Sequence, residues 1–137
     1  MIFQTQTLSF KAEMLQAVHN LLTDTIKLAL YTSSATLDEN TTVYSATNET
    51  SGTGYTAGGV TLTGATINTA DNVVYVDFDN AVWNPASFTA GGGLIYNASK
   101  GNKSIAVLSF GADKTTTTSF TVQMPTNSSS SALLRFT

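Results

Sequence analysis

The stretch Thr25-Ile-Lys-Leu-Ala-Leu-Tyr31 decides the fold of this chain, because it is the clearest alternating pattern in the first half of the sequence. Successive side chains of a β-strand point to opposite faces of a sheet. One face of this stretch therefore carries Ile26, Leu28 and Leu30, and the other carries Lys27, Ala29 and Tyr31. The pattern predicts a β-strand.

Beyond this strand, the apolar residues come in short alternating patches separated by Thr, Ser, Asn and Gly. We expect strands over 42–46, 60–62, 65–67, 72–78, 88–90, 94–96, 104–110, 116–124 and 132–136. The strand over 72–78 begins apolar on both faces, so we expect it to be central in its sheet. Many short strands with regular turn signals favour a mainly β fold, an antiparallel β-sandwich of jelly-roll or related Greek-key type.

The segment before the first strand has the period of a helix. Apolar residues from Phe10 to Leu21 recur at helical spacing, and Ser9 is a suitable N-cap, which predicts one α-helix over about 10–21. Residues 1–8 are too few to form a stable element alone, so we expect an extended N-terminal arm. With 137 residues and no composition break, residues 9–137 are expected to form a single β-sandwich domain that includes the helix.

The composition of the chain argues against several classes of function. The formal net charge is −3 and the six cationic side chains are scattered, which argues against nucleic-acid binding. No apolar run is long enough to span a membrane, and the start lacks the features of a secretion signal, so we expect a protein made and kept in a cytoplasm. Only 11% of residues are charged, against a typical quarter, which favours a surface partly covered by neighbouring proteins.

Three patterns suggest chemistry, and each has a simpler explanation. Gly52-Thr-Gly-Tyr-Thr-Ala57 matches a dinucleotide fingerprint, but no apolar strand precedes it and a strand follows, so we expect a turn-rich loop. His19 is the one histidine, and no serine lies in a nucleophile elbow, so a structural or capping role is favoured over a hydrolytic triad with Asp24. Asp77 and Asp79 share a strand face, but calcium takes six to eight oxygens, so solvated acids are favoured. We therefore expect a protein that is not an enzyme, with no catalytic residues, cofactor or metal.

Aromatic side chains give the strongest alternative. Trp83 and the five tyrosines could form a sugar-stacking platform on a β-sandwich, which would make the chain a carbohydrate-binding module. Large aromatic side chains are usually mostly buried, so core packing is favoured. The polar stretch 32–59 is unusually long for a connection inside a compact domain, and we expect it to be a functional or interfacial loop.

Several segments together resemble small virion structural proteins of tailed bacteriophages. They are Val18-His-Asn-Leu-Leu-Thr-Asp-Thr-Ile-Lys-Leu-Ala-Leu-Tyr-Thr32, Gly54-Tyr-Thr-Ala-Gly-Gly59, Val82-Trp-Asn-Pro85, Leu94-Ile-Tyr-Asn-Ala98 and Leu133-Leu-Arg-Phe136. Within that group, the size and β-rich character are similar to capsid cement, or decoration, proteins. The resemblance implies a noncatalytic protein that binds the outside of the capsid and cements neighbouring major capsid subunits. A tail or head-to-tail connector component is the nearest alternative.

The resemblance also implies partners and a location. We expect the major capsid protein as partner, self-association as a dimer or trimer, no nucleic acid or membrane, and a place on the capsid exterior. The resemblance supplies no binding motif, so the interface residues are predicted on physical grounds as Ile2, Phe3, Leu8 and Tyr55. The apolar arm residues could add a strand to the open sheet edge of a neighbour.

Overall fold

The computed structural model describes residues 1–136, and it confirms a mainly β protein with antiparallel sheets and one N-terminal α-helix. The elements are β1 (Thr5–Gln6), α1 (Leu8–Leu15), β2 (Ile26–Tyr31), β3 (Val60–Thr61), β4 (Thr66–Ala70), β5 (Val73–Asp77), β6 (Ala81–Trp83), β7 (Phe88–Asn97), the 3₁₀ helix η1 (Ala98–Lys100), β8 (Lys103–Thr116), β9 (Phe120–Val122) and β10 (Leu134–Phe136). The finer jelly-roll or Greek-key topology stays a prediction.

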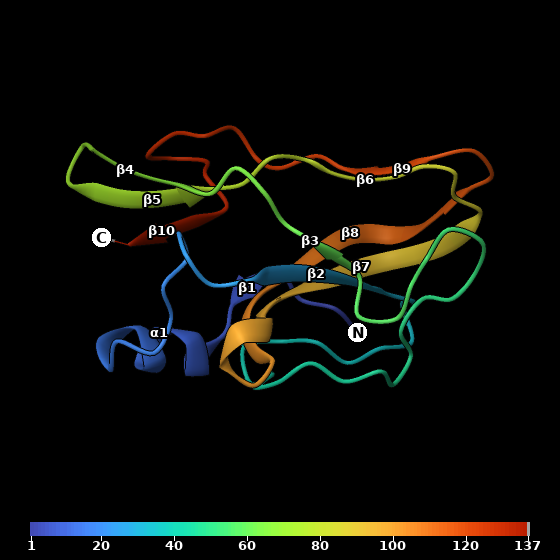
Figure 1. The fold of residues 1–137 in the computed structure, drawn as a ribbon, viewed down its shortest axis with the longest axis horizontal. Helices are drawn as coiled ribbons and strands as arrows, with labels where there is room; N and C mark the ends of the chain where they lie inside the picture. Colours follow the sequence, from blue (N-terminus) through green and yellow to red (C-terminus); the bar gives the residue numbers. More distant parts are fainter. Residues whose placement is uncertain (137) are drawn as a thin grey trace.

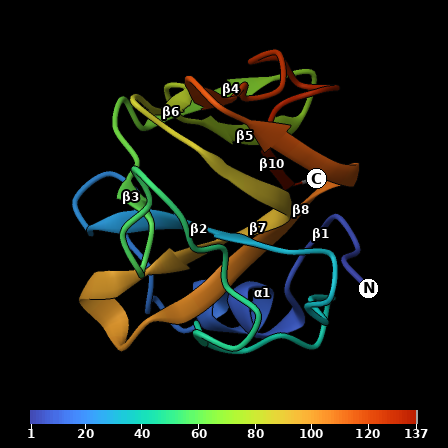
Figure 2. The ribbon, with the colours of Figure 1, turned by 90° about the vertical axis from the view of Figure 1, so that its right-hand side faces the viewer.

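The strands lie in two layers (Figure 1). The lower layer is a five-stranded sheet in the order β1-β8-β7-β2-β3. The upper layer holds a three-stranded sheet, β10-β5-β4, and the pair β6-β9. The view in Figure 2 shows the same two layers from the side, with α1 on the outer side of the lower layer. β5 is central in its sheet, as its two apolar faces predicted.

The alternation of β2 builds two cores. Ile26, Leu28 and Leu30 belong to the main cluster, which also takes in residues of β5, β6, β9 and β10 from the upper layer. Ala29 and Tyr31 belong to a second cluster on the other face of the sheet, with residues of the loop after β2. The division of faces predicted for β2 is therefore confirmed, and the loop over 32–59 covers the outer face of the five-stranded sheet.

The helix is shorter than predicted and begins earlier. It spans Leu8–Leu15 rather than 10–21, and its N-cap is Thr7 rather than Ser9, with the Thr7 hydroxyl accepting from the Phe10 amide at 3.3 Å. Ala17 has φ of 58°, and the bonds from the Ala17 amide to the Met14 carbonyl and from the Val18 amide to the Glu13 carbonyl form a Schellman ending. Glycine usually occupies the left-handed position of that motif, and because alanine occupies it here, the sequence carries no signal that the helix ends at this point.

Other strand boundaries also differ from the predictions. The segments 88–90 and 94–96 form one strand, β7, because the glycines between them let other chain segments approach closely: a Cβ on Gly92 would lie 2.4 Å from the Leu108 carbonyl oxygen. The strand predicted over 116–124 is confirmed only for Phe120–Val122, which form β9, because β8 ends at Thr116 and the chain turns before β9 begins. Residues 42–46 form no strand and pair only through an isolated bridge between Val43 and Lys103.

The predicted arm is docked onto the body over its whole length. The Met1 amine donates to the Ala35 carbonyl at 2.8 Å, and the Phe3 amide donates to the Leu37 carbonyl at 2.9 Å. Further along, β1 pairs with β8, and Leu8 is already the first residue of α1. The backbone of the arm therefore already pairs with its own chain, so fewer of its amide and carbonyl groups are free to add a strand to the sheet of a neighbour.

Candidate interaction surface

Helix α1 is apolar on two faces. Phe10 is fully buried and Met14 packs against the main core, so this face holds the helix to the body. On the other face, Leu8 and Leu15 are 53% and 91% exposed, and the exposed Ala12 lies between them. Residues at i, i+4 and i+7 share one face of a helix, so these three side chains form an apolar stripe facing solvent, bordered by the exposed Lys11 and here called the outer stripe.

The start of α1 is fixed by buried polar groups. The Thr7 amide donates to the Ile105 carbonyl at 3.0 Å, which ties the N-cap to β8. The hydroxyl of Ser104, also on β8 and fully buried, donates to the Thr7 hydroxyl at 2.9 Å. The helix therefore begins at a fixed place on the sheet, and the outer stripe is presented by an ordered element rather than by a free arm.

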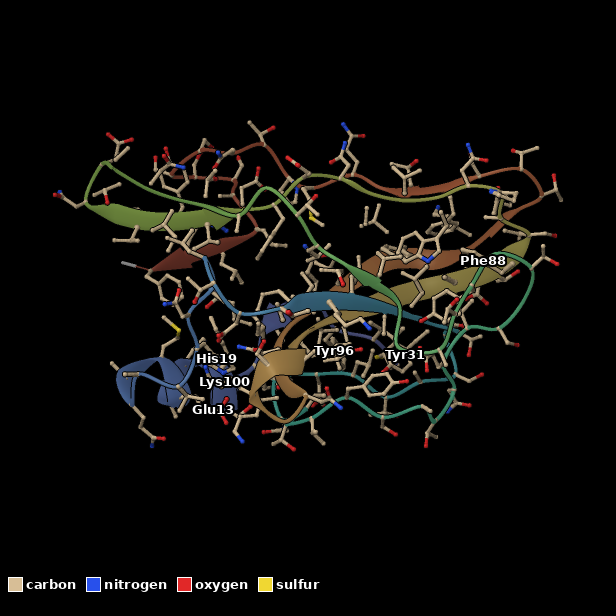
Figure 3. All side chains as sticks on the ribbon, viewed as in Figure 1. Glu13, His19, Tyr31, Phe88, Tyr96 and Lys100 are labelled. Carbon is tan, nitrogen blue, oxygen red and sulfur yellow. The ribbon has the colours of Figure 1, made fainter. Side chains whose placement is uncertain are left out.

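The end of α1 is fixed by a network around His19 (Figure 3). Nε2 of His19 lies 2.9 Å from Oε1 of Glu13 on α1, and Nδ1 lies 3.0 Å from Nδ2 of Asn97 at the end of β7. Asn97 Nδ2 also donates to Asp24 at 2.8 Å, and Lys100 on η1 forms an ion pair with Asp24 at 3.1 Å. Burial opposes ionisation of Asp24, but the bonds it accepts and the charge of Lys100 hold its pKa below the usual range.

A second polar cluster holds the loop over 32–59. The carboxylate of Glu49 accepts from the hydroxyl of Tyr44 at 2.6 Å, from the hydroxyl of Tyr55 at 2.5 Å and from the amide of Gly58 at 2.7 Å. The rings of Tyr44 and Tyr96 stack with centroids 4.8 Å apart. Burial, together with the hydrogen bond and charge of Glu49, raises the pKa of Tyr44 and of Tyr55, so both phenols stay protonated donors.

The predicted interface residues separate into two groups. Phe3 is 52% exposed and Leu8 lies on the outer stripe, so both are available to a partner. Ile2 packs against the second core cluster beside Gly92, and Tyr55 packs against the main core while its hydroxyl bonds to Glu49. The last two therefore contribute to internal packing, and the structure does not bring all four residues into one patch.

Leu15 and Glu49 were missed by sequence reasoning. Leu15 lies inside the predicted helix but was assigned to neither of its faces, and the structure shows that it points outward. For Glu49, the available signal was a carboxylate that lies between two tyrosines of the same loop, Tyr44 and Tyr55.

His19 lies in a hydrogen-bond network, whereas Asp77 is partly buried and is not the solvated acid that was predicted. Both ring nitrogens of His19 contact carboxylate or amide groups, and neither contacts a hydroxyl. Over residues 1–136, no group of three His, Cys, Asp or Glu side chains is placed to hold a metal ion. Asp77 has one buried oxygen without a partner, and burial together with the charge of Asp79 raises the pKa of Asp77 despite the opposing bond from the Phe78 amide.

Trp83 and most of the tyrosines of the proposed sugar platform lie in the packed interior of the protein. Trp83 is only 4% exposed, and its ring lies within 6.3 Å of the rings of Tyr55, Phe88 and Phe120, centroid to centroid. Tyr31 and Tyr96 are buried as well, beneath the loop over 32–59 (Figure 3). Gly52 and Gly54 both have positive φ and are followed by turns, not by a helix, so the residues of the dinucleotide fingerprint form a loop.

Comparisons with protein-family models, with curated proteins and with solved structures find no match to this chain. Within the described residues, no helix has the length and apolar character needed to cross a membrane.

Proposed function

We propose that this protein is a noncatalytic virion structural protein that binds the outer surface of a phage capsid and cements neighbouring major capsid subunits. The observation that carries the proposal is the outer stripe of α1, in which Leu8, Ala12 and Leu15 face solvent on a helix whose other face is already in the core. A helix that is apolar on both faces is typical of one that is covered on both sides.

The spacing of the stripe matches a known way in which helices bind. Helices that dock into grooves of partner proteins present anchors at i, i+3, i+4 and i+7. Covering one exposed leucine side chain contributes about 1.5–3 kcal/mol, so the two leucines could supply the apolar centre of a specific contact. The low charge of the chain supports the same function, because charged residues are depleted at the centres of interfaces.

The direct test is binding to capsid shells that lack this protein. Purified protein is added to shells of the major capsid protein, and the bound fraction is measured by sedimentation. We expect saturable binding, and we expect Leu15→Gln to weaken it by roughly tenfold or more, since 1.4 kcal/mol corresponds to a factor of ten.

Val82→Gln is the matched control for this experiment. Val82 is also an exposed apolar residue, at 54%, but it lies on β6 in the other layer. We expect the control to bind like the unaltered protein. Absence of binding by the unaltered protein, or equal loss in both variants, would refute the proposal in this form.

The fluorescence of Trp83 separates this function from glycan binding. Because the ring is 4% exposed and enclosed by other aromatic rings, we expect blue-shifted emission that oligosaccharides neither quench nor shift. A saturable change in emission on adding a glycan would favour a carbohydrate-binding module instead. No contact of the described residues favours that second function, so one function is proposed.

A further inference from the structure

His19 is the one histidine of the chain, and its side chain is fully buried where α1 meets the corner formed by β7 and η1 (Figure 3). An imidazole is the side chain whose charge changes most readily near neutral pH. The proposed function makes no use of this residue. What its two nitrogens can accept or donate is fixed by the groups around them.

The contacts determine which nitrogen carries the proton. The amide Nδ2 of Asn97 is only a donor, so Nδ1 of His19, at 3.0 Å, must be the acceptor. Nε2 then carries the hydrogen and donates it to the Glu13 carboxylate at 2.9 Å. The structure therefore holds a neutral imidazole with its proton on Nε2.

The orientation of the Asn97 amide is itself fixed from two sides. Its oxygen accepts from the Ser99 amide at 3.0 Å, and its Nδ2 group donates a second hydrogen to Asp24 at 2.8 Å. Asp24 stays ionised in mildly acidic solution, because the bonds it accepts hold its pKa below the usual range. Asn97 therefore cannot turn its oxygen toward His19 without losing both bonds.

We propose that His19 is an acid-sensitive latch that joins α1 and the turn after it to the corner of β7 and η1. When the imidazole takes a second proton from solvent, that proton binds to Nδ1, so that two hydrogen-bond donors, Nδ1 and the Asn97 amide, face each other. The bond between Nδ1 and Asn97 is lost, whereas the bond between Nε2 and Glu13 becomes an ion pair. At neutral pH His19 bonds to both Glu13 on α1 and Asn97 on β7, whereas in acid it bonds to Glu13 alone.

The other groups around His19 offer no new acceptor for a proton on Nδ1. Glu13 on α1 contacts the other ring nitrogen, Nε2, at 2.9 Å, and this contact does not involve Asn97. The charge of Lys100 on η1 is paired with Asp24. The Phe10 ring lies 5.2 Å away, and the residues of β4, β5 and β10 that line the adjoining hollow are uncharged: Ile67, Val74, Val76 and Phe136.

Opening of the latch would loosen the end of the element that carries the outer stripe. The latch itself stands on the contacts above, and only its consequence for capsid binding rests on the proposed function. If that function holds, attachment through α1 is weaker in acid than at neutral pH. The latch is therefore tested on the isolated full-length protein, where capsid binding has no influence.

Two measurements on the isolated protein test the latch. Nitrogen-15 NMR of the single histidine at pH 7.5 is expected to show the Nε2–H form, with the Asn97 side-chain amide shifting as the imidazole titrates. Amide exchange of residues 16–24 and 97–100, corrected for the intrinsic effect of pH, is expected to rise roughly fivefold or more between pH 7.5 and 5.0, as loss of a buried hydrogen bond implies.

His19→Gln is the matched variant, because glutamine does not titrate. It is expected to lose the change in exchange with pH, and if it fails to fold, the two measurements on the unaltered protein still decide the matter. A proton on Nδ1 at pH 7.5, unchanged exchange on acidification, or the same acid response in His19→Gln would each overturn the latch.

Discussion

Single carboxylates fix the parts of this protein that carry no regular structure. Glu49 accepts three hydrogen bonds, all from residues of its own loop, and so closes the segment between Tyr44 and Gly58. Hydrogen bonds to a charged group are stronger than those between neutral groups. This arrangement explains how a stretch with few large apolar residues can cover one face of a sheet.

Replacing Glu49 by Gln should loosen this loop. The glutamine amide would present hydrogens to donors, and we expect the free energy of unfolding to fall by about 1–3 kcal/mol. Amide exchange in residues 44–58 should rise in the same variant. Glu39→Gln is the control, since Glu39 is exposed, and it should change the free energy of unfolding by less than about 0.5 kcal/mol. Equal stability of the two variants, measured by denaturant unfolding, would contradict the role of Glu49.

Asp24 makes stability depend on pH in a defined direction. Its pKa in the folded protein lies below the usual value of 3.8, so its contribution is fully present above that value and is lost as pH falls through the lower, folded pKa. We expect Asp24→Asn to reduce the free energy of unfolding by about 1–3 kcal/mol at pH 7, because the ionised group accepts bonds from Asn20, Asn97 and Lys100. Denaturant unfolding from pH 7 down to about 2 should show this difference shrinking in acid. A difference that grew in acid would be inconsistent with a lowered pKa.

The two faces of α1 are expected to serve different purposes: the buried face stabilises the fold, and the exposed face binds the partner. Phe10→Ala removes a fully buried ring and should lower the free energy of unfolding by about 3–5 kcal/mol. Leu15→Gln changes a side chain that is already 91% exposed and should alter it by less than about 0.5 kcal/mol. Thermal or denaturant unfolding checks both values, and a large loss in Leu15→Gln would mean that the outer stripe belongs to the core.

Elements with a clean period were predictable from the sequence. The two faces of β2 followed from its alternation, and the central place of β5 followed from its apolar start on both faces. The end of α1 did not, because Ala17 occupies a left-handed position that glycine usually fills. Two strands were predicted where β7 is one, because the sequence does not show that the glycines between them continue the strand and allow neighbouring segments to approach closely.

The candidate surface was only partly predictable. Leu8 was expected at an interface as part of an arm, whereas in the structure it opens the outer stripe. Leu15 was not predicted, because it lies outside the periodic apolar positions of the predicted helix and the sequence alone does not show which other positions stay exposed. Tyr55 was expected at an interface, and its hydroxyl instead bonds to Glu49.

The whole molecule covers the five-stranded sheet on both faces. The upper layer lies on one face, and α1 with the loop over 32–59 lies on the other (Figure 1). The N-terminal segment follows the same side and pairs with β8 before the helix begins. Its outward apolar side chains, Phe3 and those of the outer stripe, therefore come from an ordered part of the chain.

A reconstruction of the virus particle tests this account most directly. Cryo-electron microscopy of particles that contain this polypeptide should place it on the capsid exterior, with Leu8 and Leu15 of α1 covered by a major capsid subunit or by a second copy at a subunit junction. Particles that lack the polypeptide, or a reconstruction in which the outer stripe faces solvent while another surface meets the shell, would contradict it.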